Sequence, residues 1–263
     1  MTEVKSTGNH DLKQDYRREI GKKTLFIGGS LVSLVVLVIL SCAVGTGYGF
    51  FETYQIIVDR LMGVEPSNIT EWWADHYVCE NILPGIVAAI IAGAGLSLGG
   101  AVMQSMMGNP LADPYTTGIS SGACFGAVLS ITMGLSFGTM TGDVGIVAMA
   151  FVGALIPSIL IILLSRFVNS SPSTLILIGT AISYFFNALV TYVMVISDAD
   201  ALQDAFTWQI GAVSDIHWGD LPLMLIVVSI SSILILLVSN KLNLMMMGDD
   251  SAKTLGLDVD NFR

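Results

Sequence analysis

The chain has 263 residues, of which 53% are hydrophobic and only 12% are charged, and its formal net charge at pH 7 is −10. Soluble domains carry about 25% charged residues, so the composition excludes an ordinary soluble domain. The acidic balance also argues against a nucleic-acid partner. We therefore expect an integral membrane protein whose main surroundings are the lipid bilayer.

Long stretches without Asp, Glu, Lys or Arg separate the charged segments of the chain. Each is long enough for a membrane-crossing helix, which needs about 20 apolar residues to cross about 30 Å of hydrocarbon. Helices are expected because lipid cannot satisfy open backbone groups, and residues 31–40 (LVSLVVLVIL) lack the alternation of a barrel strand. The sequence predicts an all-α fold, a polytopic transmembrane bundle of about six spans. These spans lie near residues 25–46, 82–107, 118–140, 144–164, 175–196 and 221–238.

The basic residues indicate how the chain is oriented, because loops rich in Lys and Arg stay in the cytoplasm. With the N-terminus inside, the inner segments hold ten of the eleven Lys and Arg residues. All four tryptophans fall in the outer segments, as expected for residues at a membrane interface. We predict a multi-pass protein of the cell membrane with a cytoplasmic tail over residues 1–24 and a membrane domain over residues 25–263. The expected inner segments are 1–24, 108–117, 165–174 and 239–263.

The outer segments are acidic, with Arg60 as their one basic residue. This pattern is typical of a solvated acidic surface, and a docking face for a complementary partner is the alternative interpretation. Their carboxylates are Glu52, Asp59, Glu65, Glu71, Asp75, Glu80, Asp143, Asp198, Asp200, Asp204, Asp215 and Asp220.

Cysteine and histidine patterns do not predict a metal centre. Cys42, Cys79 and Cys124 have no metal-ligand spacing. A disulfide between Cys42 and Cys79 is conceivable, but small buried packing residues are the first expectation. A metal shared by His76 and His217 is a weak alternative, so we expect no metal and no cofactor.

The second span carries small residues on one face and is followed by a rigid break. Ala88, Ala92, Gly95 and Gly99 are spaced by three or four residues, which lets helix backbones approach closely in lipid and predicts a central helix. Two prolines then interrupt the helix, because proline lacks an N–H and restricts its predecessor. The loop residues singled out are Asn109, Pro110, Asp113 and Pro114.

Four segments, in order, resemble the FecCD-type permeases of ABC importers, the family that includes the BtuC-like cobalamin permeases. They are GAVMQSMMGNPLADPYTTGISSGACFGAV (100–128), LILIGTAISYFFNALVTYVM (175–194), DALQDAFTWQIG (200–211) and LNLMMMGDDSAKTLGLDV (242–259). The resemblance implies a permease that takes up iron-siderophore ligands, with haem or cobalamin as alternatives, and that is not itself an enzyme.

The resemblance also implies roles for particular residues. Residues 242–259 would be the cytoplasmic segment that couples to an ATPase, and Leu255 and Leu257 would be its apolar anchors within a helix-in-groove contact. The loop between the fourth and fifth spans would form an inner gate. Ser183, Asn187 and Thr191 would line the translocation path, although interhelical hydrogen bonds explain that stripe equally well. The full sets are Gly248, Asp249, Asp250, Ser251, Ala252, Lys253, Thr254, Leu255, Gly256 and Leu257 for coupling, and Ser171, Pro172, Ser173 and Thr174 for the gate.

The expected partners are a second permease copy in a homodimer, cytoplasmic ABC ATPase subunits and an extracytoplasmic substrate-binding protein. Docking of that binding protein is in question, because Ile82 and Gly85 stand where the family usually has arginines. Family members also have about ten helices, whereas this chain ends at Arg263, just past the coupling segment. We therefore expect a truncated product, half of a split permease or a fragment.

Other functional classes lack their signals. No P-loop and no HExxH motif occurs, so ATP hydrolysis is expected on a separate chain. A proton- or ion-coupled transporter usually carries ionisable groups within its spans, and the six predicted spans have none. An inactive membrane scaffold is the remaining alternative.

Overall fold

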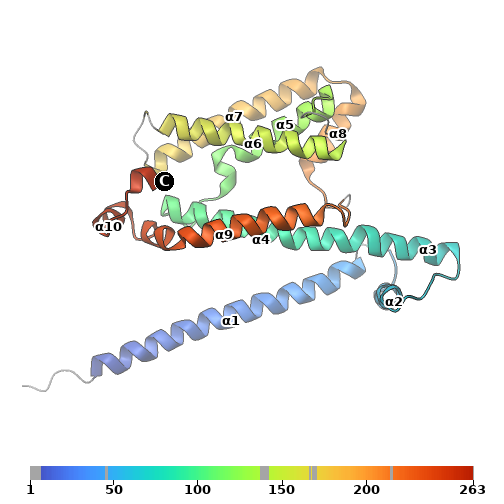
Figure 1. Ribbon diagram of the computed structural model, residues 1–263, viewed down its shortest axis with the longest axis horizontal. Helices are drawn as coiled ribbons and strands as arrows, with labels where there is room; N and C mark the ends of the chain where they lie inside the picture. Colours follow the sequence, from blue (N-terminus) through green and yellow to red (C-terminus); the bar gives the residue numbers. More distant parts are fainter. Residues whose placement is uncertain are drawn as a thin grey trace, which may run out of the picture. The chain divides into compact units, whose positions relative to one another are not determined.

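The computed structural model describes residues 7–44, 47–136, 142–165, 167, 171–213 and 216–262 (Figure 1). Every regular element among these residues is a helix. The chain forms two compact units, one made of Met1–Val87 and Ser214–Trp218 and the other of Ala88–Val213 and Gly219–Arg263. Each unit is described by itself.

The first unit begins with the long helix α1 (Thr7–Val44) and the amphipathic helix α2 (Phe50–Leu61). Helix α3 (Ile69–His76) then runs through the π-helix η1 (Tyr77–Ile82) into α4 (Leu83–Met107). Helix α3 starts where it does because the Asn68 side chain accepts a hydrogen bond from the Glu71 N–H at 2.9 Å, as an N-cap does.

The second unit holds the rest of α4 and most of the apolar helices. Its elements are η2 (Pro114–Thr117), α5 (Ile119–Met133), α6 (Asp143–Ser165), α7 (Pro172–Ile196), α8 (Ala199–Ile210), α9 (Leu221–Met245), α10 (Asp249–Thr254) and α11 (Val259–Phe262). One core cluster joins α5, α7 and α8 through the buried side chains of Val128, Val190, Val193 and Ala205.

Helices α5 and α6 pack backbone against backbone. A Cβ atom added at Gly122 would lie 2.5 Å from the carbonyl oxygen of Gly153 and 2.5 Å from Cγ of Pro157. A Cβ atom at Gly126 would clash with the carbonyl of Met149. Such close approach is open only to residues without side chains, and it lets van der Waals contact hold helices together in lipid.

All six predicted spans correspond to helices, but they differ in length. Five helical stretches within the described ranges are long and apolar enough to cross a membrane, and α5, with 15 residues, is a shorter apolar helix. It ends at Gly134, whose φ of +64° stops the helix, so the predicted span over 118–140 is shortened. Residues 137–141 lie outside the described residues. At the other end of the chain, α1 begins at Thr7, inside the expected tail.

Helix α4 is little enclosed by the described residues. Only 11% of the apolar window within Ile69–Met107 is buried among them, so the central position of α4 stays a prediction. Gly95 does face Val228 of α9, where an added Cβ would lie 3.2 Å from Cγ2. Gly99 faces Pro114 in the same way, at 3.4 Å.

Candidate coupling segment, gate and translocation helix

The expected coupling segment folds into two short helices that pack against the end of α9. Helix α10 lies between Gly248 and Gly256, whose φ angles of +92° and +88° favour glycine. Ala252 is fully buried between Met245 of α9 and Val259 of α11. These contacts fix α10 to the end of α9.

The two predicted anchors of this segment behave differently. Leu255 is 58% exposed, whereas Leu257 is half-buried and packs against the cluster of Met245, Ala252 and Val259. The neighbouring Met246 and Met247 are each 62% exposed. The exposed apolar surface of the segment is therefore Leu255 with the two methionines, while Leu257 packs inside the segment.

The expected gate is the first turn of α7. Ser171 has an extended backbone and its hydroxyl accepts a hydrogen bond from the Thr174 N–H at 3.3 Å. Pro172 follows at the first helical position, where its missing N–H costs nothing. Ser171 and Pro172 thus make a sharp helix start, and Ser173 and Thr174 are helical.

The proline-containing loop is stiffened by its own polar side chains. The Asn109 carboxamide accepts a hydrogen bond from the Leu111 N–H at 2.9 Å. Asp113 caps η2 by accepting from the Thr116 N–H at 3.0 Å. Prolines 110 and 114 restrict the backbone between these turns.

This loop touches the gate helix at two places. Ala112 of the loop is buried against Leu175 of α7 and Met107 of α4. One turn further along, a Cβ atom at Gly179 would clash with the carbonyl of Thr116, and one at Gly118 would lie 3.0 Å from Cγ2 of Ile182. The structure thus brings the proline-containing loop and the expected gate together. Both lie at the end of the apolar helices that we predict to be cytoplasmic.

Sequence reasoning missed the part played by Gly118 and Gly179. Gly118 has a φ of +80°, a left-handed conformation that joins η2 to α5. A glycine directly after a short polar turn and directly before an apolar run is the signal that would have identified it.

The proposed path residues lie on α7 beside its buried face. Asn187 and Thr191 are exposed and Ser183 is half-buried. The hydroxyls of Ser183 and Thr191 each donate to the carbonyl oxygen four residues earlier in α7, at 2.9 Å. These hydrogen bonds stay within one helix and do not support the alternative of interhelical bonds for these two residues.

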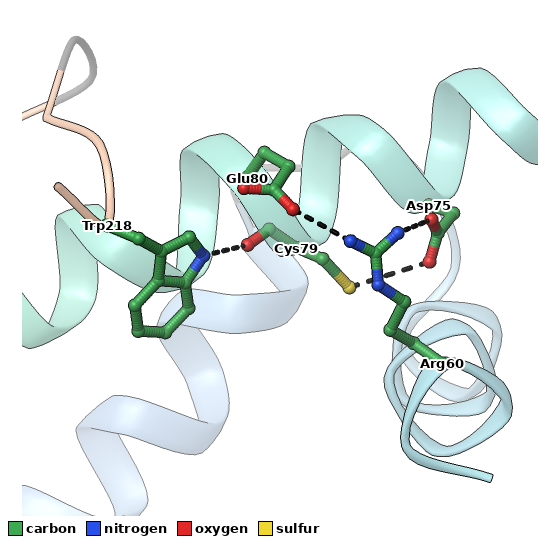
Figure 2. A network of polar contacts seen from close by, with 5 residues as sticks. All are labelled: Arg60, Asp75, Cys79, Glu80 and Trp218. Carbon is green, nitrogen blue, oxygen red and sulfur yellow. Dashed lines mark hydrogen bonds and ion pairs between the residues drawn. The ribbon is translucent and has the colours of Figure 1, made fainter. Parts of the chain in front are cut away.

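A polar network joins segments that we predict to lie outside the membrane, and it was not predicted from the sequence (Figure 2). Arg60 of α2 pairs with Asp75 of α3 and, at 2.7 Å, with Glu80 of η1. The neighbouring Asp75 carboxylate is the main reason why the pKa of Arg60 is raised, so the guanidinium stays charged. The Cys79 thiol donates to Asp75 at 3.7 Å, and the Trp218 indole N–H donates to the Cys79 carbonyl at 2.8 Å.

The cysteines are all free, including Cys42 and Cys79, whose pairing was left open. Within the described ranges, no group of three or more His, Cys, Asp or Glu side chains is placed to hold a metal ion. His76 instead stacks on Trp72 with ring centroids 5.2 Å apart. Asp215, the neighbour of His217 in the weak metal hypothesis, lies outside the described residues.

Comparison with known proteins shows which family has this sequence pattern and fold. Residues 31–263 match the FecCD transport family. The chain belongs to this family. FecCD relatives include the vitamin B12 import system permease protein BtuC of Vibrio cholerae, which is 32% identical over 186 residues, covering 71% of this chain and 55% of BtuC.

Another FecCD relative is the Fe(3+)-citrate import system permease protein YfmE of Bacillus subtilis. It is 31% identical over 238 residues, which cover 89% of this chain and 67% of YfmE. The chain thus spans about half to two thirds of the length of these two relatives.

A solved structure of a metal-chelate-type ABC transporter, in an inward-facing conformation, has the same fold. Its TM-score with this chain is 0.68 at 26% identity, and the match covers 89% of this chain and 70% of the other. The FecCD resemblance seen in the four sequence segments and the all-helical membrane fold are both confirmed.

Proposed function

We propose that this chain is the transmembrane permease subunit of an ABC importer for iron-siderophore-type ligands. The observation that carries the proposal is the family match over residues 31–263, which contains the loop, the gate and the coupling segment. The named relatives import vitamin B12 and Fe(3+)-citrate, and the solved homologue is of metal-chelate type. A bulky metal chelate is the shared ligand class, with haem and cobalamin as the alternatives to a siderophore.

In this proposal the chain sits in the cell membrane with its N-terminus in the cytoplasm and pairs with a second copy. A separate ATPase binds the surface made by Leu255, Met246 and Met247, in the manner of a helix in a groove. Because Ala252 and Leu257 fix α10 to the end of α9, movement of the ATPase would be passed to the membrane helices. A substrate-binding protein would deliver the ligand from outside.

In this proposal, the first turn of α7, which is the expected gate, moves together with the proline-containing loop. The contact of Gly179 with Thr116 leaves no room for a side chain, so a displacement of η2 would shift the start of α7. That helix carries the uncharged stripe of Ser183, Asn187 and Thr191. A stripe whose hydroxyls are bonded to their own helix suits passage of a large ligand, because it offers few strong donors to hold it.

Leu255→Asp tests the coupling role. The tagged chain is purified from its native membranes in mild detergent, and the ATPase activity that co-purifies is measured. A charge placed in the centre of an apolar contact typically costs enough binding energy to lower recovery roughly tenfold or more. Uptake of ⁵⁵Fe-ferrichrome into vesicles, with vitamin B12 and haemin as parallel probes, then identifies the ligand.

Asn240→Asp is the matched control, because Asn240 is exposed near the same end of α9 and the change adds the same charge outside the segment. We expect its ATPase recovery to equal that of the unchanged chain. Equal recovery with Leu255→Asp would contradict the coupling role and favour the scaffold interpretation.

A further inference from the structure

Helix α2 presents two different faces. One arc is apolar and open, with exposed fractions of 86% for Phe51, 82% for Leu61 and 74% for Met62, which directly follows the helix. The opposite arc carries Glu52 and Asp59, which line a cavity of about 410 Å³ formed with α3. A short helix with one apolar and one charged face is the pattern of helices that lie in a membrane interface.

The position of α2 along α1 agrees with such a location. The Tyr54 hydroxyl donates to the carbonyl oxygen of Ile39 at 2.5 Å. Ile39 is 14 residues beyond Leu25, where the predicted first span begins, and at 1.5 Å per residue this is about 21 Å along a crossing of about 30 Å. The Tyr54 hydroxyl therefore meets α1 about 9 Å inside the outer boundary of the hydrocarbon, within the depth that the apolar face of an interfacial helix reaches.

The apolar surface of α2 is also continuous with the exposed apolar surface of α1. Only 6% of the apolar window of α1 is buried among the described residues, and Ile39 itself is 39% exposed. The apolar face of α2 joins the outer part of α1, so in a membrane it would lie next to the hydrocarbon. This continuity favours lipid over a second protein as the occupant.

The ion pairs of Arg60 fix which face of α2 turns outward (Figure 2). Arg60 lies on the polar side and is held by Asp75, whose side chain is only 12% exposed, and by Glu80. With this side tied to α3 and η1, Phe51 and Leu61 cannot turn inward. The polar network thus sets the rotation of α2 about its own axis.

We propose that α2 is an interfacial helix that lies in the headgroup region of the outer leaflet. Phe51, Leu61 and Met62 reach the part of the acyl chains just beneath the headgroups, while Glu52 and Asp59 face water. Because the polar face is acidic, binding rests on buried apolar area and does not need anionic lipid.

The test places an environment-sensitive nitrobenzoxadiazole probe on single cysteines at positions 51, 61 and 55, one at a time. The full chain, with Cys42, Cys79 and Cys124 replaced by alanine, is reconstituted in phosphatidylcholine nanodiscs. Gln55 is exposed and lines the acidic cavity, so it is the matched control. We expect a lipid with a doxyl group near the headgroup to quench the probes at 51 and 61 roughly twofold more than the probe at 55. Iodide in the water should show the opposite order.

Two outcomes would overturn the proposal. Iodide quenching at 51 and 61 as strong as at 55 would mean that the face lies in water. Protection from both quenchers would mean that protein covers it. If the cysteine-free chain is not monodisperse, the probes are placed in the unchanged chain, where Cys42 and Cys79 are only 4% and 6% exposed, and the signal of the chain without added cysteines is subtracted.

Discussion

At the scale of single residues, the closest helix packing among the described residues depends on glycines, which have no side chain. Gly122 and Gly126 of α5 let that helix touch the backbone of α6 at Gly153 and Met149. In lipid there is no water to exclude, so close van der Waals contact has to supply the attraction. A methyl group at the contact would separate the helices and weaken every contact along the pair.

Gly126→Ala should therefore destabilise the chain although alanine is the better helix former. We expect a cost of about 1–3 kcal/mol, as for other overpacked sites, and a lower midpoint of thermal unfolding in detergent. Gly100→Ala is the control, because nothing lies within 4 Å of a Cβ atom added there. Equal midpoints for the two variants would contradict the packing argument.

Sequence reasoning predicted close packing on α4, but the closest backbone contacts among the described residues lie between α5 and α6. The spacing of Gly95 and Gly99 drew attention to α4, where each glycine meets only one side chain, Val228 or Pro114. The equal spacing of Gly122 and Gly126 passed unnoticed. Small residues four apart show that a helix can be approached closely, but the partner is decided by tertiary structure.

At the scale of elements, helix ends are determined by caps more than by hydropathy. Apolar content predicted a span from residue 175, yet α7 begins three residues earlier at Pro172 because Ser171 caps it. Similarly, Gly134 ends α5 although apolar residues continue beyond it. Hydropathy measures where lipid can be, whereas hydrogen bonds decide where a helix starts and stops.

Ser171→Ala tests the cap of the gate helix. Losing an N-cap costs about 1 kcal/mol, so hydrogen exchange at the Thr174 amide should become roughly fivefold faster. Ser171→Asp keeps an acceptor at the cap and should exchange at the original rate. If both variants exchange alike, the Ser171 hydroxyl does not hold the first turn of α7.

The coupling segment shows the same limit for a site. Its position followed from sequence motifs, but the inward turn of Leu257 did not. That turn depends on Met245 in α9 and Val259 in α11, which lie on either side of the segment and meet only after folding. A motif therefore identifies a site, while its exposed and buried members are known only from packing.

At the scale of the whole molecule, the orientation still rests on charge. Ten of the eleven basic residues lie in the segments predicted to be cytoplasmic, and positively charged loops stay inside. The helices are consistent with either orientation, because length and apolar content are the same in both directions.

Single cysteines at positions 55 and 250, both exposed, test the orientation in intact cells. A membrane-impermeant maleimide should label the cysteine at 55, which lines the acidic cavity, and leave the one at 250 unlabelled until the membrane is opened. The cysteine-free chain gives the background. Labelling at 250 in sealed cells would reverse the proposed topology.

The brevity of α5 has a consequence for the surrounding bilayer. A helix of 15 residues is about 22 Å long at 1.5 Å per residue, whereas a typical hydrocarbon core is about 30 Å thick. In the proposed topology, this hydrophobic mismatch is relieved where the membrane thins or water enters beside α5. The backbone groups just beyond Gly134 then find hydration instead of hydrocarbon. In the proposed topology, the stability of the α5–α6 pair therefore depends on the length of the surrounding acyl chains.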